Sequence, residues 1–409
     1  MTPTVACRAC GGAQLVPVVS LGTMALANAL VPQDLPKSDE PAFPLELVFC
    51  PDCTLVQLTV SVSPELLFRD YVYFSSYSDT VVRSAREIAR RVMQRQALAG
   101  GSLAVEVASN DGYLLQHYKE AGVPVLGIEP AQNIAKVAEE RGIPTLRDFF
   151  GRDLAATLAK RGQSADVLHA NNVLAHVPDL NGFVAGISLV LKEKGLAVIE
   201  VPYVKDMIDG CAFDTIYHEH LCYFSLTALD RLMDRYGLVI EEVESIPAQG
   251  GSLRLFVRRK AGYGQGPSVI GLLADEATWG VGDLQFYRNF ASKMEAVRQT
   301  LPALLKTLKG QGRIVAGYGA AAKGAVLLNY CRIGPEVLDY VVDRNPHKQG
   351  LAMPGVRIPV VSPDRLVEQP PDDLLILPWN IAEEVMAQQA AYRDRGGRFV
   401  IPIPVPRVV

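Results

Sequence analysis

The sequence has no excess of basic charge. Its 409 residues contain 40 Lys and Arg against 44 Asp and Glu, which gives a formal net charge of −4. A surface that follows nucleic-acid phosphates needs a basic excess or a dense basic patch. The basic runs are short, as at Arg258–Lys260, and such a run is more simply a solvated strand end. Nucleic acid is therefore not expected as a partner.

Long apolar runs are also missing. No stretch reaches the ~18 to 20 apolar residues that a bilayer span requires. The segment Met1–Cys10 has no apolar signal-peptide core. We therefore expect a cytoplasmic protein with no membrane partner. In a reducing compartment its seven cysteines should be thiols or metal ligands rather than disulfides.

Four of these cysteines form two closely spaced pairs. Cys7-x-x-Cys10 and Cys50-x-x-Cys53 each lie in a tight turn, where two thiolates can face one ion. Four thiolates complete a tetrahedron and leave no open position, so the spacing predicts a structural zinc site. A redox role is disfavoured because neither pair opens the helix of a βαβ unit. The gap between the pairs leaves room for a β-rich insertion at residues 11–49.

The rest of the chain alternates apolar strands with helical segments, which is typical of parallel sheets with helical crossovers. The pattern occurs twice, so we expect an α/β protein with two Rossmann-like domains in tandem after a small zinc-binding domain. The expected boundaries are residues 1–66 for the zinc-binding domain, 67–265 for a central methyltransferase domain and 266–409 for the C-terminal domain.

Individual elements follow from the same pattern. A helix should lie within residues 67–99, and another should run from residue 112 to 121. An antiparallel pair at 238–243 and 252–258 should close the central sheet, as is usual in methyltransferases. The remaining strands are expected at 103–108, 125–129, 165–170, 196–201, 313–318, 338–343, 374–377 and 398–401.

The turn after the first central strand has the residues of a cofactor loop. Glu106 lies near the strand end, where an acid can bind the amino-acid part of a cofactor. Ala108 and Asn110 occupy positions where methyltransferase loops often have glycine, and Gly112 and Tyr113 open the helix. The loop is poor in glycine and is weak evidence by itself.

Two later strand ends support the same cofactor. Glu129, followed by Pro130, ends the second strand, where an acid would bind two ribose hydroxyls. Asn171 and Asn172 belong to a segment that resembles the fourth-strand motif of methyltransferases. The features favour S-adenosylmethionine over a dinucleotide because the first turn lacks G-x-G-x-x-G. A structural alternative stays open, in which the two acids only cap helices.

The segment Tyr217-His218-Glu219-His220 is the densest cluster of catalytic residue types in the chain. Together with His176 it follows strand ends of the central domain, where an active-site rim is expected. Methyl transfer to carbon needs a carbanion, and a histidine base could make one by removing a proton next to a ketone. A metal site and a structural polar network remain alternatives. The pattern does not distinguish His218 from His220.

A glycine-rich turn, Gly317–Gly324, follows a C-terminal strand and opens a helix. This geometry suits a phosphate, and Lys323 adds a positive charge. A second dinucleotide site and a close-packed turn without a ligand are the alternatives.

These motifs, with Phe43-Pro44-Leu45 and the run from Tyr71 to Ser78, resemble the nucleotide-sugar C-methyltransferases, the family that includes TDP-sugar C-3′-methyltransferases. The resemblance covers residues 5–405. It implies a monomer with three domains, zinc, S-adenosylmethionine and a TDP-linked 4-keto-6-deoxy sugar. The C-terminal domain would help to hold the nucleotide sugar.

The resemblance also implies roles for single residues. His220 would remove the proton at C-3, Glu219 and Tyr217 would support it, and His176 and Tyr71 would lie near the sugar. Ala108 departs from the family, whose members usually have glycine there. The residues expected to bind substrate are Tyr73, Ser76, Tyr77, His218, Tyr318 and Lys323. An O- or N-methyltransferase of a small metabolite and a non-catalytic zinc-organised binding protein are the alternatives.

Overall fold

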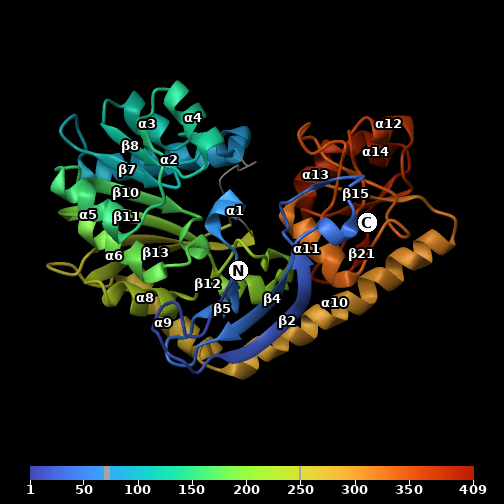
Figure 1. Ribbon diagram of the computed structural model, residues 1–409, viewed down its shortest axis with the longest axis horizontal. Coiled ribbons are helices and arrows are strands. Elements are labelled where there is room, and N and C mark those ends of the chain that lie inside the picture. Colours follow the sequence, from blue (N-terminus) through green and yellow to red (C-terminus); the bar gives the residue numbers. More distant parts are fainter. Residues whose placement is uncertain (69–73, 248–249) are drawn as a thin grey trace.

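The computed structural model describes residues 1–68, 74–247 and 250–409, so Tyr71 and Tyr73 lie outside the described residues. The central sheet and its helices form one half of the molecule, and the C-terminal domain forms the other (Figure 1). Strands of the N-terminal segment run beneath both halves and connect them. The predicted mixed α/β class is confirmed.

The central sheet has seven strands in the order β13-β14-β11-β10-β7-β8-β9. The five strands from β11 to β9 are parallel, while β14 and β13 are antiparallel to their neighbours, as predicted. Their bounds are Ala104–Val107 (β7), Val125–Ile128 (β8), Thr145–Leu146 (β9), Ala165–Asn171 (β10), Leu191–Pro202 (β11), Leu238–Ile246 (β13) and Ser252–Arg259 (β14).

Helices cover both faces of this sheet. Alternate residues of each strand face opposite sides: Val167 of β10 packs under α2 and α3, while Leu168 packs against α5, α6 and α8. The inner strand β7 is therefore buried along its whole length, whereas the edge strands β9 and β13 are partly exposed. The helices are Asp79–Gln96 (α2), Leu115–Glu120 (α3), Gln132–Glu140 (α4), Arg152–Lys160 (α5), Leu180–Val190 (α6), Val204–Asp209 (α7) and Leu226–Asp234 (α8).

Helix α3 begins three residues later than the predicted start at residue 112. The φ angles of Ala108, Asn110 and Gly112 are +54°, +49° and +80°, so the loop repeatedly enters the left-handed region. Such residues cannot continue a right-handed helix, which delays its start.

The N-terminal segment forms a four-stranded antiparallel sheet in the order β12-β5-β4-β2. β2 (Val16–Ala25) and β4 (Ala42–Phe49) confirm the β-rich insertion between the cysteine pairs. β5 spans Val56–Leu58. The fourth strand, β12, is Cys222–Tyr223 and comes from the central part of the chain, directly after His220. The remaining short elements are β1 (Thr2–Pro3), β3 (Val31–Pro32), β6 (Val60–Ser61) and α1 (Pro64–Phe68).

The C-terminal domain is built on a second sheet in the order β18-β16-β15-β19-β20-β21, parallel except for β21. Its strands are Val315–Tyr318 (β15), Val341–Val342 (β16), Val360–Val361 (β18), Asp373–Ile376 (β19), Arg398–Ile401 (β20) and Arg407–Val408 (β21). Its helices are Ala322–Cys331 (α11), Arg365–Glu368 (α12), Ala382–Gln388 (α13) and Ala390–Asp394 (α14).

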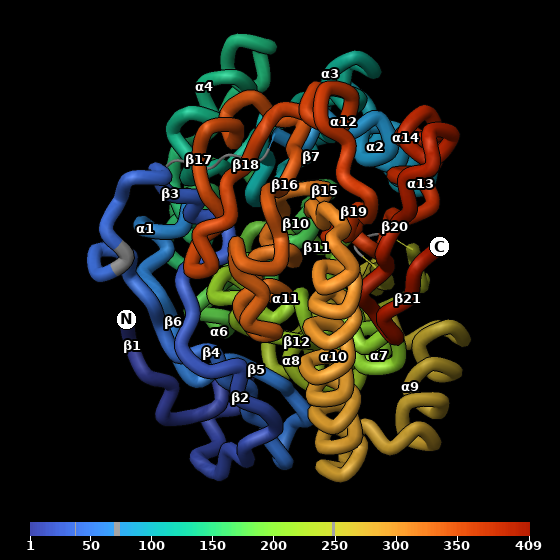
Figure 2. The backbone as a smooth tube through the Cα atoms, turned by 90° about the vertical axis from the view of Figure 1, so that its right-hand side faces the viewer, coloured from blue at the N-terminus to red at the C-terminus, as the bar shows by residue number. Residues whose placement is uncertain are grey.

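Contacts of several kinds join the C-terminal domain to the rest. The long helix α10 (Leu284–Gly310) runs along the N-terminal sheet toward this domain (Figures 1 and 2), and the rings of Phe49 and Tyr287 lie 4.8 Å apart. β17 (Leu351–Ala352) pairs with β3. The ring of Tyr330 on α11 lies 5.1 Å from that of Phe213. Within the described ranges, no helix is both long and apolar enough to span a membrane.

Helix α9 (Pro267–Trp279) follows the expected boundary at residue 265 but packs on the central domain. Its buried Glu276 accepts hydrogen bonds from the Tyr203 hydroxyl at 2.8 Å and from the amides of Leu226 and Thr227 at 2.7 Å each. The carboxylate therefore satisfies the first amides of α8 and fixes α9 beside it.

Candidate functional site

The four cysteines of the two pairs come together. Their sulfur atoms all lie within 4.8 Å of one another, and the Cys7–Cys53 and Cys10–Cys50 distances are 3.5 Å. Zinc–sulfur bonds of about 2.3 Å in a tetrahedron place sulfurs about 3.8 Å apart, so the cluster fits zinc. The hydrogen bond with Cys53 lowers the pKa of Cys7 to about 4, while burial raises that of Cys50 to about 11. A cation would favour the thiolate form of all four.

Arginines attach both cysteine turns to the central domain. On α8, Arg235 donates to the carbonyl of Ala9 at 2.8 Å, and Arg231 donates to that of Asp52 at 2.9 Å. The zinc site therefore fixes the N-terminal sheet against the domain that carries the other candidate residues.

The cofactor loop contains buried oxygen atoms that lack donors. Glu106 is 1% exposed, and neither carboxylate oxygen has a hydrogen-bond partner of normal length among the described residues. Burial raises the pKa of Glu106 well above its usual range, the Glu129 carboxylate adds to the shift, and the Tyr113 hydroxyl opposes it. The side-chain oxygens of Asn171 and Asn172 are also buried without a partner in the described part of the chain. Such a group suits a ligand with an ammonium and hydroxyl donors, as S-adenosylmethionine has.

Glu129 is held rigidly at the end of β8. Its two oxygens accept 2.9 Å hydrogen bonds from the amides of Asn110 and Ala131, on either side of the strand end. Each oxygen keeps a lone pair for a further donor, which a ribose could supply. Pro130 follows directly. Gly112 is required here because a β-carbon would lie 2.9 Å from Ile143.

Residues 75–77 close over this loop. The amide of Ser75 donates to the Asn110 side chain at 2.9 Å, and Ser76 bonds the carboxylate of Asp111. Ser76 is one of the expected substrate residues, but its side chain is hydrogen-bonded to the cofactor loop. The side chain of Tyr77 stacks on Phe74 and is exposed.

The structure separates the two histidines that the sequence pattern leaves equivalent. His218 is buried, and its Nε2 lies 3.2 Å from the carbonyl oxygens of Phe43 and Pro44 in the N-terminal sheet. His220 lies 2.8 Å through Nδ1 from the carbonyl oxygen of Thr215. A carbonyl only accepts, so Nδ1 of His220 carries the proton and Nε2 keeps its lone pair. His218 anchors the segment, but its Nδ1 also keeps a lone pair and is buried with no hydrogen-bond partner among the described residues. What distinguishes the two rings is that His220 lines the pocket described next and His218 does not.

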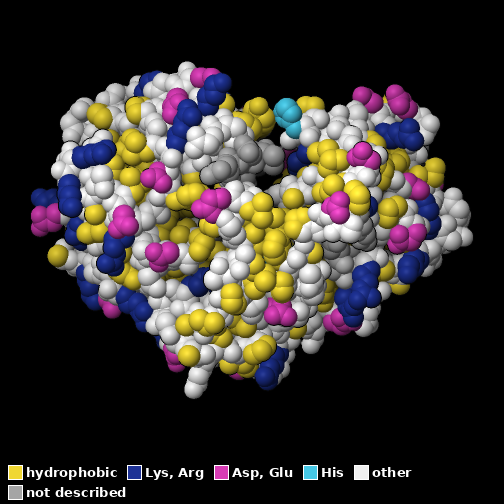
Figure 3. Space-filling model, in the orientation of Figure 1, with side chains coloured by type: hydrophobic (Ala, Val, Ile, Leu, Met, Phe, Trp, Pro, Cys, Tyr) yellow, Lys and Arg dark blue, Asp and Glu magenta, His cyan; other side chains and the backbone are white. Residues whose placement is uncertain are grey.

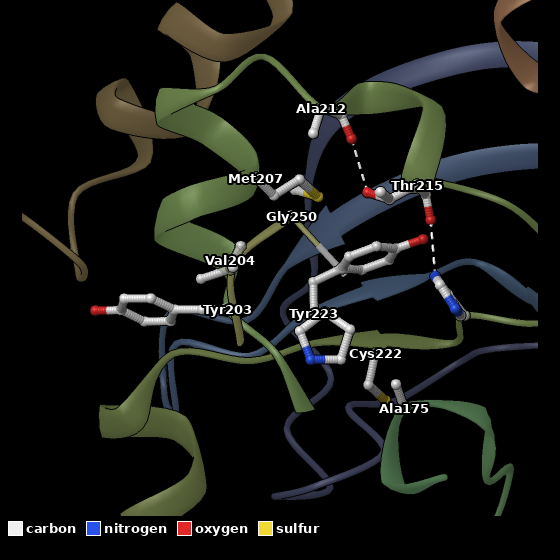
Figure 4. Close-up of a pocket in the computed structure, with 12 residues that line it drawn as sticks. Ala175, Tyr203, Val204, Met207, Ala212, Thr215, Cys222, Tyr223 and Gly250 are labelled. Carbon is white, nitrogen blue, oxygen red and sulfur yellow. Dashed lines mark hydrogen bonds between the residues drawn. The ribbon is translucent and has the colours of Figure 1, made fainter. Parts of the chain in front are cut away.

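His220 lies in the wall of a small pocket, whose cavity volume is about 20 Å³. The pocket lies between β12, α7 and the residues that follow β11, as the labelled Cys222, Tyr203 and Val204 show in Figure 4. The ring of Tyr217 lies 4.0 Å from that of His220, and the ring of His176 lies 4.8 Å away. Burial lowers the pKa of His220 to about 4, so the ring is neutral at pH 7.

Two residues near this pocket were not among the predicted site residues. The Tyr223 hydroxyl is buried and has no hydrogen-bond partner among the residues described, while Tyr203 directs its hydroxyl away to Glu276 (Figure 4). Asn28 of the N-terminal segment donates to Glu219 at 2.7 Å. Burial raises the pKa of Glu219 to about 7. Tyr223 follows His220 closely in the sequence, but no motif marks Asn28.

The glycine-rich turn of the C-terminal domain is partly occupied by its own side chains. The amide of Ala320 donates to the carboxylate of Asp343 at 2.7 Å, and Lys348 donates to the carbonyl of Ala320 at 2.8 Å. The Tyr318 hydroxyl accepts from Gln389 at 3.3 Å. Lys323 extends away from the turn, toward Asp214 in the central domain. The surface is hollowed between the two halves of the molecule (Figure 3).

Three family models match consecutive parts of the chain. Residues 7–68 match one described as "Putative zinc binding domain", residues 82–243 match "Methyltransferase domain", and residues 247–404 match "C-methyltransferase C-terminal domain". The curated C-methyltransferase NovU of Streptomyces niveus is 36% identical over 404 residues, which cover 98% of this chain and 96% of that protein.

Other likenesses are partial. A ubiquinone biosynthesis O-methyltransferase of Methylobacterium nodulans is 30% identical over 122 residues, 29% of this chain and 46% of that protein. Magnesium protoporphyrin IX methyltransferase of Synechocystis, solved with bound S-adenosylmethionine, is 13% identical with a TM-score of 0.35, covering 46% of this chain and 85% of that one.

The cysteine cluster predicts that the N-terminal sheet depends on zinc. Cys50→Ser should abolish stoichiometric zinc and greatly reduce methyl transfer, because that sheet holds Asn28 and the carbonyls that anchor His218. Atomic absorption measures the metal, and calorimetry should show that S-adenosylmethionine still binds. Cys331→Ser, which alters a buried thiol outside the cluster, is the control. A Cys50→Ser protein with full zinc content would contradict the assignment.

The φ angle of +54° at Ala108 predicts a stabilising substitution. A non-glycine residue in the left-handed region costs about 1–2 kcal/mol, so Ala108→Gly should raise the free energy of unfolding by up to about 1 kcal/mol after the added chain entropy is counted. Urea denaturation of the protein without ligand measures the difference. Ala104→Gly, in the regular strand β7, should lower stability instead; a loss of stability in both variants would show that Ala108 is not strained.

Proposed function

The chain belongs to the C-methyltransferase family, and from this we propose that it methylates a carbon atom next to the ketone of a nucleotide-linked sugar. It is an S-adenosylmethionine-dependent enzyme. When bound, that cofactor supplies an electrophilic methyl group. The substrate that we propose is a TDP-linked 4-keto-6-deoxy sugar, with methylation at C-3.

The observation that carries the proposal is the geometry of His220. Its Nδ1–H donates to the Thr215 carbonyl, so the Nε2 lone pair is available as a base in the wall of the pocket. The base takes a proton from the carbon next to the ketone, and the electron pair left behind forms an enolate. The enolate carbon then attacks the methyl group. Burial keeps His220 neutral at pH 7, as a base must be.

The neighbours of His220 would position and support its ring. Tyr217 and His176 pack against its ring and fix its plane. Glu219 accepts from Asn28 through one oxygen, and its second oxygen is buried with no hydrogen-bond partner among the described residues; its role would be to support His220. Tyr71, outside the described residues, is proposed near the sugar by resemblance alone, and so is Tyr73 as a substrate contact.

The cofactor-binding residues follow from the loop geometry. Glu106 would hold the amino group, Glu129 the ribose, and Asn171 and Asn172 further polar atoms. Ala108, Asn110, Gly112, Tyr113 and Pro130 would shape the loop around them. For the sugar nucleotide we propose Ser76, Tyr77, His218 and Tyr318 as further contacts or supports. We also propose the division at residues 66 and 265, and a monomer that works without nucleic acid.

An activity screen tests this function. Incubation with S-adenosylmethionine and TDP-, UDP- or GDP-linked 4-keto-6-deoxy sugars should give a product whose NMR spectrum has a new C–CH₃ signal, best with TDP. In D₂O without S-adenosylmethionine, the C-3 proton should exchange. An O–CH₃ or N–CH₃ signal, or no product from any keto sugar while S-adenosylmethionine binds, would refute it.

The two histidines give a matched pair of variants. His220→Asn should lower C-3 exchange and methyl transfer by about 10²–10⁴-fold, because the base is lost. Calorimetry should show unchanged affinity for S-adenosylmethionine. His218→Asn should chiefly lower stability, since His218 anchors the segment to Phe43 and Pro44, and the folded protein should still exchange the proton. Exchange at the wild-type rate in His220→Asn would exclude His220 as the base.

A further inference from the structure

A buried cation lies behind the wall of the pocket that contains His220. Lys323 is in the first turn of α11, yet its ammonium is 3.7 Å from the position that a β-carbon on Gly250 would occupy. Gly250 lines the pocket together with His220 and Tyr223. The ammonium is buried and has no hydrogen-bond partner in residues 1–68, 74–247 and 250–409. Gly250, which lines the pocket, is thus also next to the ammonium.

Burial lowers the pKa of Lys323, and two neighbouring groups oppose this effect without forming a hydrogen bond to the ammonium. Asp214 is fully buried, and one of its carboxylate oxygens accepts from the indole N–H of Trp379 at 2.6 Å. The charge of Asp214 raises the pKa of Lys323, although burial lowers it more. The ammonium also lies 5.7 Å from the centre of the Trp379 ring, on whose face a cation is stabilised.

The same short helix connects this cation with the base. Asp214 and Thr215 are neighbours in the 3₁₀ helix η4 (Phe213–Thr215). Asp214 faces Lys323, and the Thr215 carbonyl fixes the tautomer of His220. The helix η4 therefore connects the base, which lines the pocket, with the carboxylate that faces the ammonium behind the pocket wall.

A role in binding phosphate fits these contacts less well. The first amide of the glycine-rich turn, at Ala320, is already bonded to the carboxylate of Asp343. A phosphate at that place would have to displace a carboxylate and would meet its charge. Lys323 extends from the turn toward the central domain, and it is Lys348 that stays beside Asp343.

We propose that Lys323 is a catalytic residue whose ammonium stabilises the enolate oxygen formed when His220 removes the neighbouring proton. The proposal rests on the function proposed above. The C–H bond breaks, its proton goes to Nε2 of His220, and its electron pair becomes the enolate. The ammonium gives up no proton and only lowers the energy of the oxygen anion. When the new C–C bond forms, the methyl–sulfur bond breaks and the carbonyl is restored.

The weakness of the base makes such a cation necessary. Burial holds the pKa of His220 at about 4, and a weak base removes a proton next to a ketone only when the enolate is strongly stabilised. An ammonium in a site shielded from water acts with less dielectric screening than one at the surface.

Lys323→Met tests the proposal, because methionine keeps the length of the side chain and removes the charge. We expect C-3 exchange in D₂O and methyl transfer at saturating substrate each to fall by about 10²–10³-fold, the effect of losing one oxyanion donor. The affinity for TDP alone, measured by calorimetry, should change less than threefold. Lys306→Met, an exposed lysine on α10, removes the same charge from the C-terminal part of the chain and should behave as wild type.

The other outcomes overturn the proposal. Weaker TDP binding with unchanged turnover at saturation would make Lys323 a diphosphate ligand. Unchanged exchange with lost transfer would remove it from enolate formation. If TDP binding shows that Lys323→Met does not fold, Lys323→Arg should keep part of the exchange, and its complete loss would count against a charge effect. A wild-type protein that exchanges no keto sugar refutes the proposed function itself and this role with it.

Discussion

The short pairing between β5 and β12 fixes the candidate site. Cys222 and Tyr223 pair with Gln57 and Val56 of the N-terminal sheet, and the amide of Leu58 donates to the carbonyl of Leu221 at 2.9 Å. On the other side the amide of Leu221 donates to the carbonyl of Ala175 at 2.7 Å. The chain just after His220 is thus bonded to two domains at once. The backbone of a catalytic segment held in this way has little freedom to move, so side-chain hydrogen bonds are left to set the chemistry.

Those side-chain bonds give two similar histidines opposite tasks. His218 directs Nε2 to main-chain carbonyls of the N-terminal sheet, while His220 directs Nδ1 to the carbonyl of Thr215. In each ring one nitrogen is hydrogen-bonded. Of the two rings, only the ring of His220 lines the pocket. The zinc site supports the bonds of His218 indirectly, because it stabilises the turns that flank β4 and β5.

Sequence patterns predicted the parts of the fold that depend on local chemistry. The cysteine spacing predicted the cluster, and the alternation of strands and helices predicted both sheets, including the antiparallel β13 and β14. The start of α3 was wrong because the left-handed φ angle of Gly112 leaves no mark in a pattern of apolar residues. A local pattern also carries no information on contacts between residues far apart in the sequence. The bond of Asn28 with Glu219, 191 positions apart, could therefore not be predicted.

The arrangement divides the proposed reaction among three domains, and electrostatics gives a reason. Here Trp379 donates to one oxygen of Asp214, while the other oxygen and the Lys323 ammonium each have no hydrogen-bond partner among the described residues. The charge remains partly uncompensated until an anion forms nearby. Trp379 and Lys323 belong to the C-terminal domain, and Asp214 and His220 belong to the central domain. The base, the carboxylate and the cation therefore come together only when the two domains are docked. A central domain alone would have the base without the cation that makes a weak base effective.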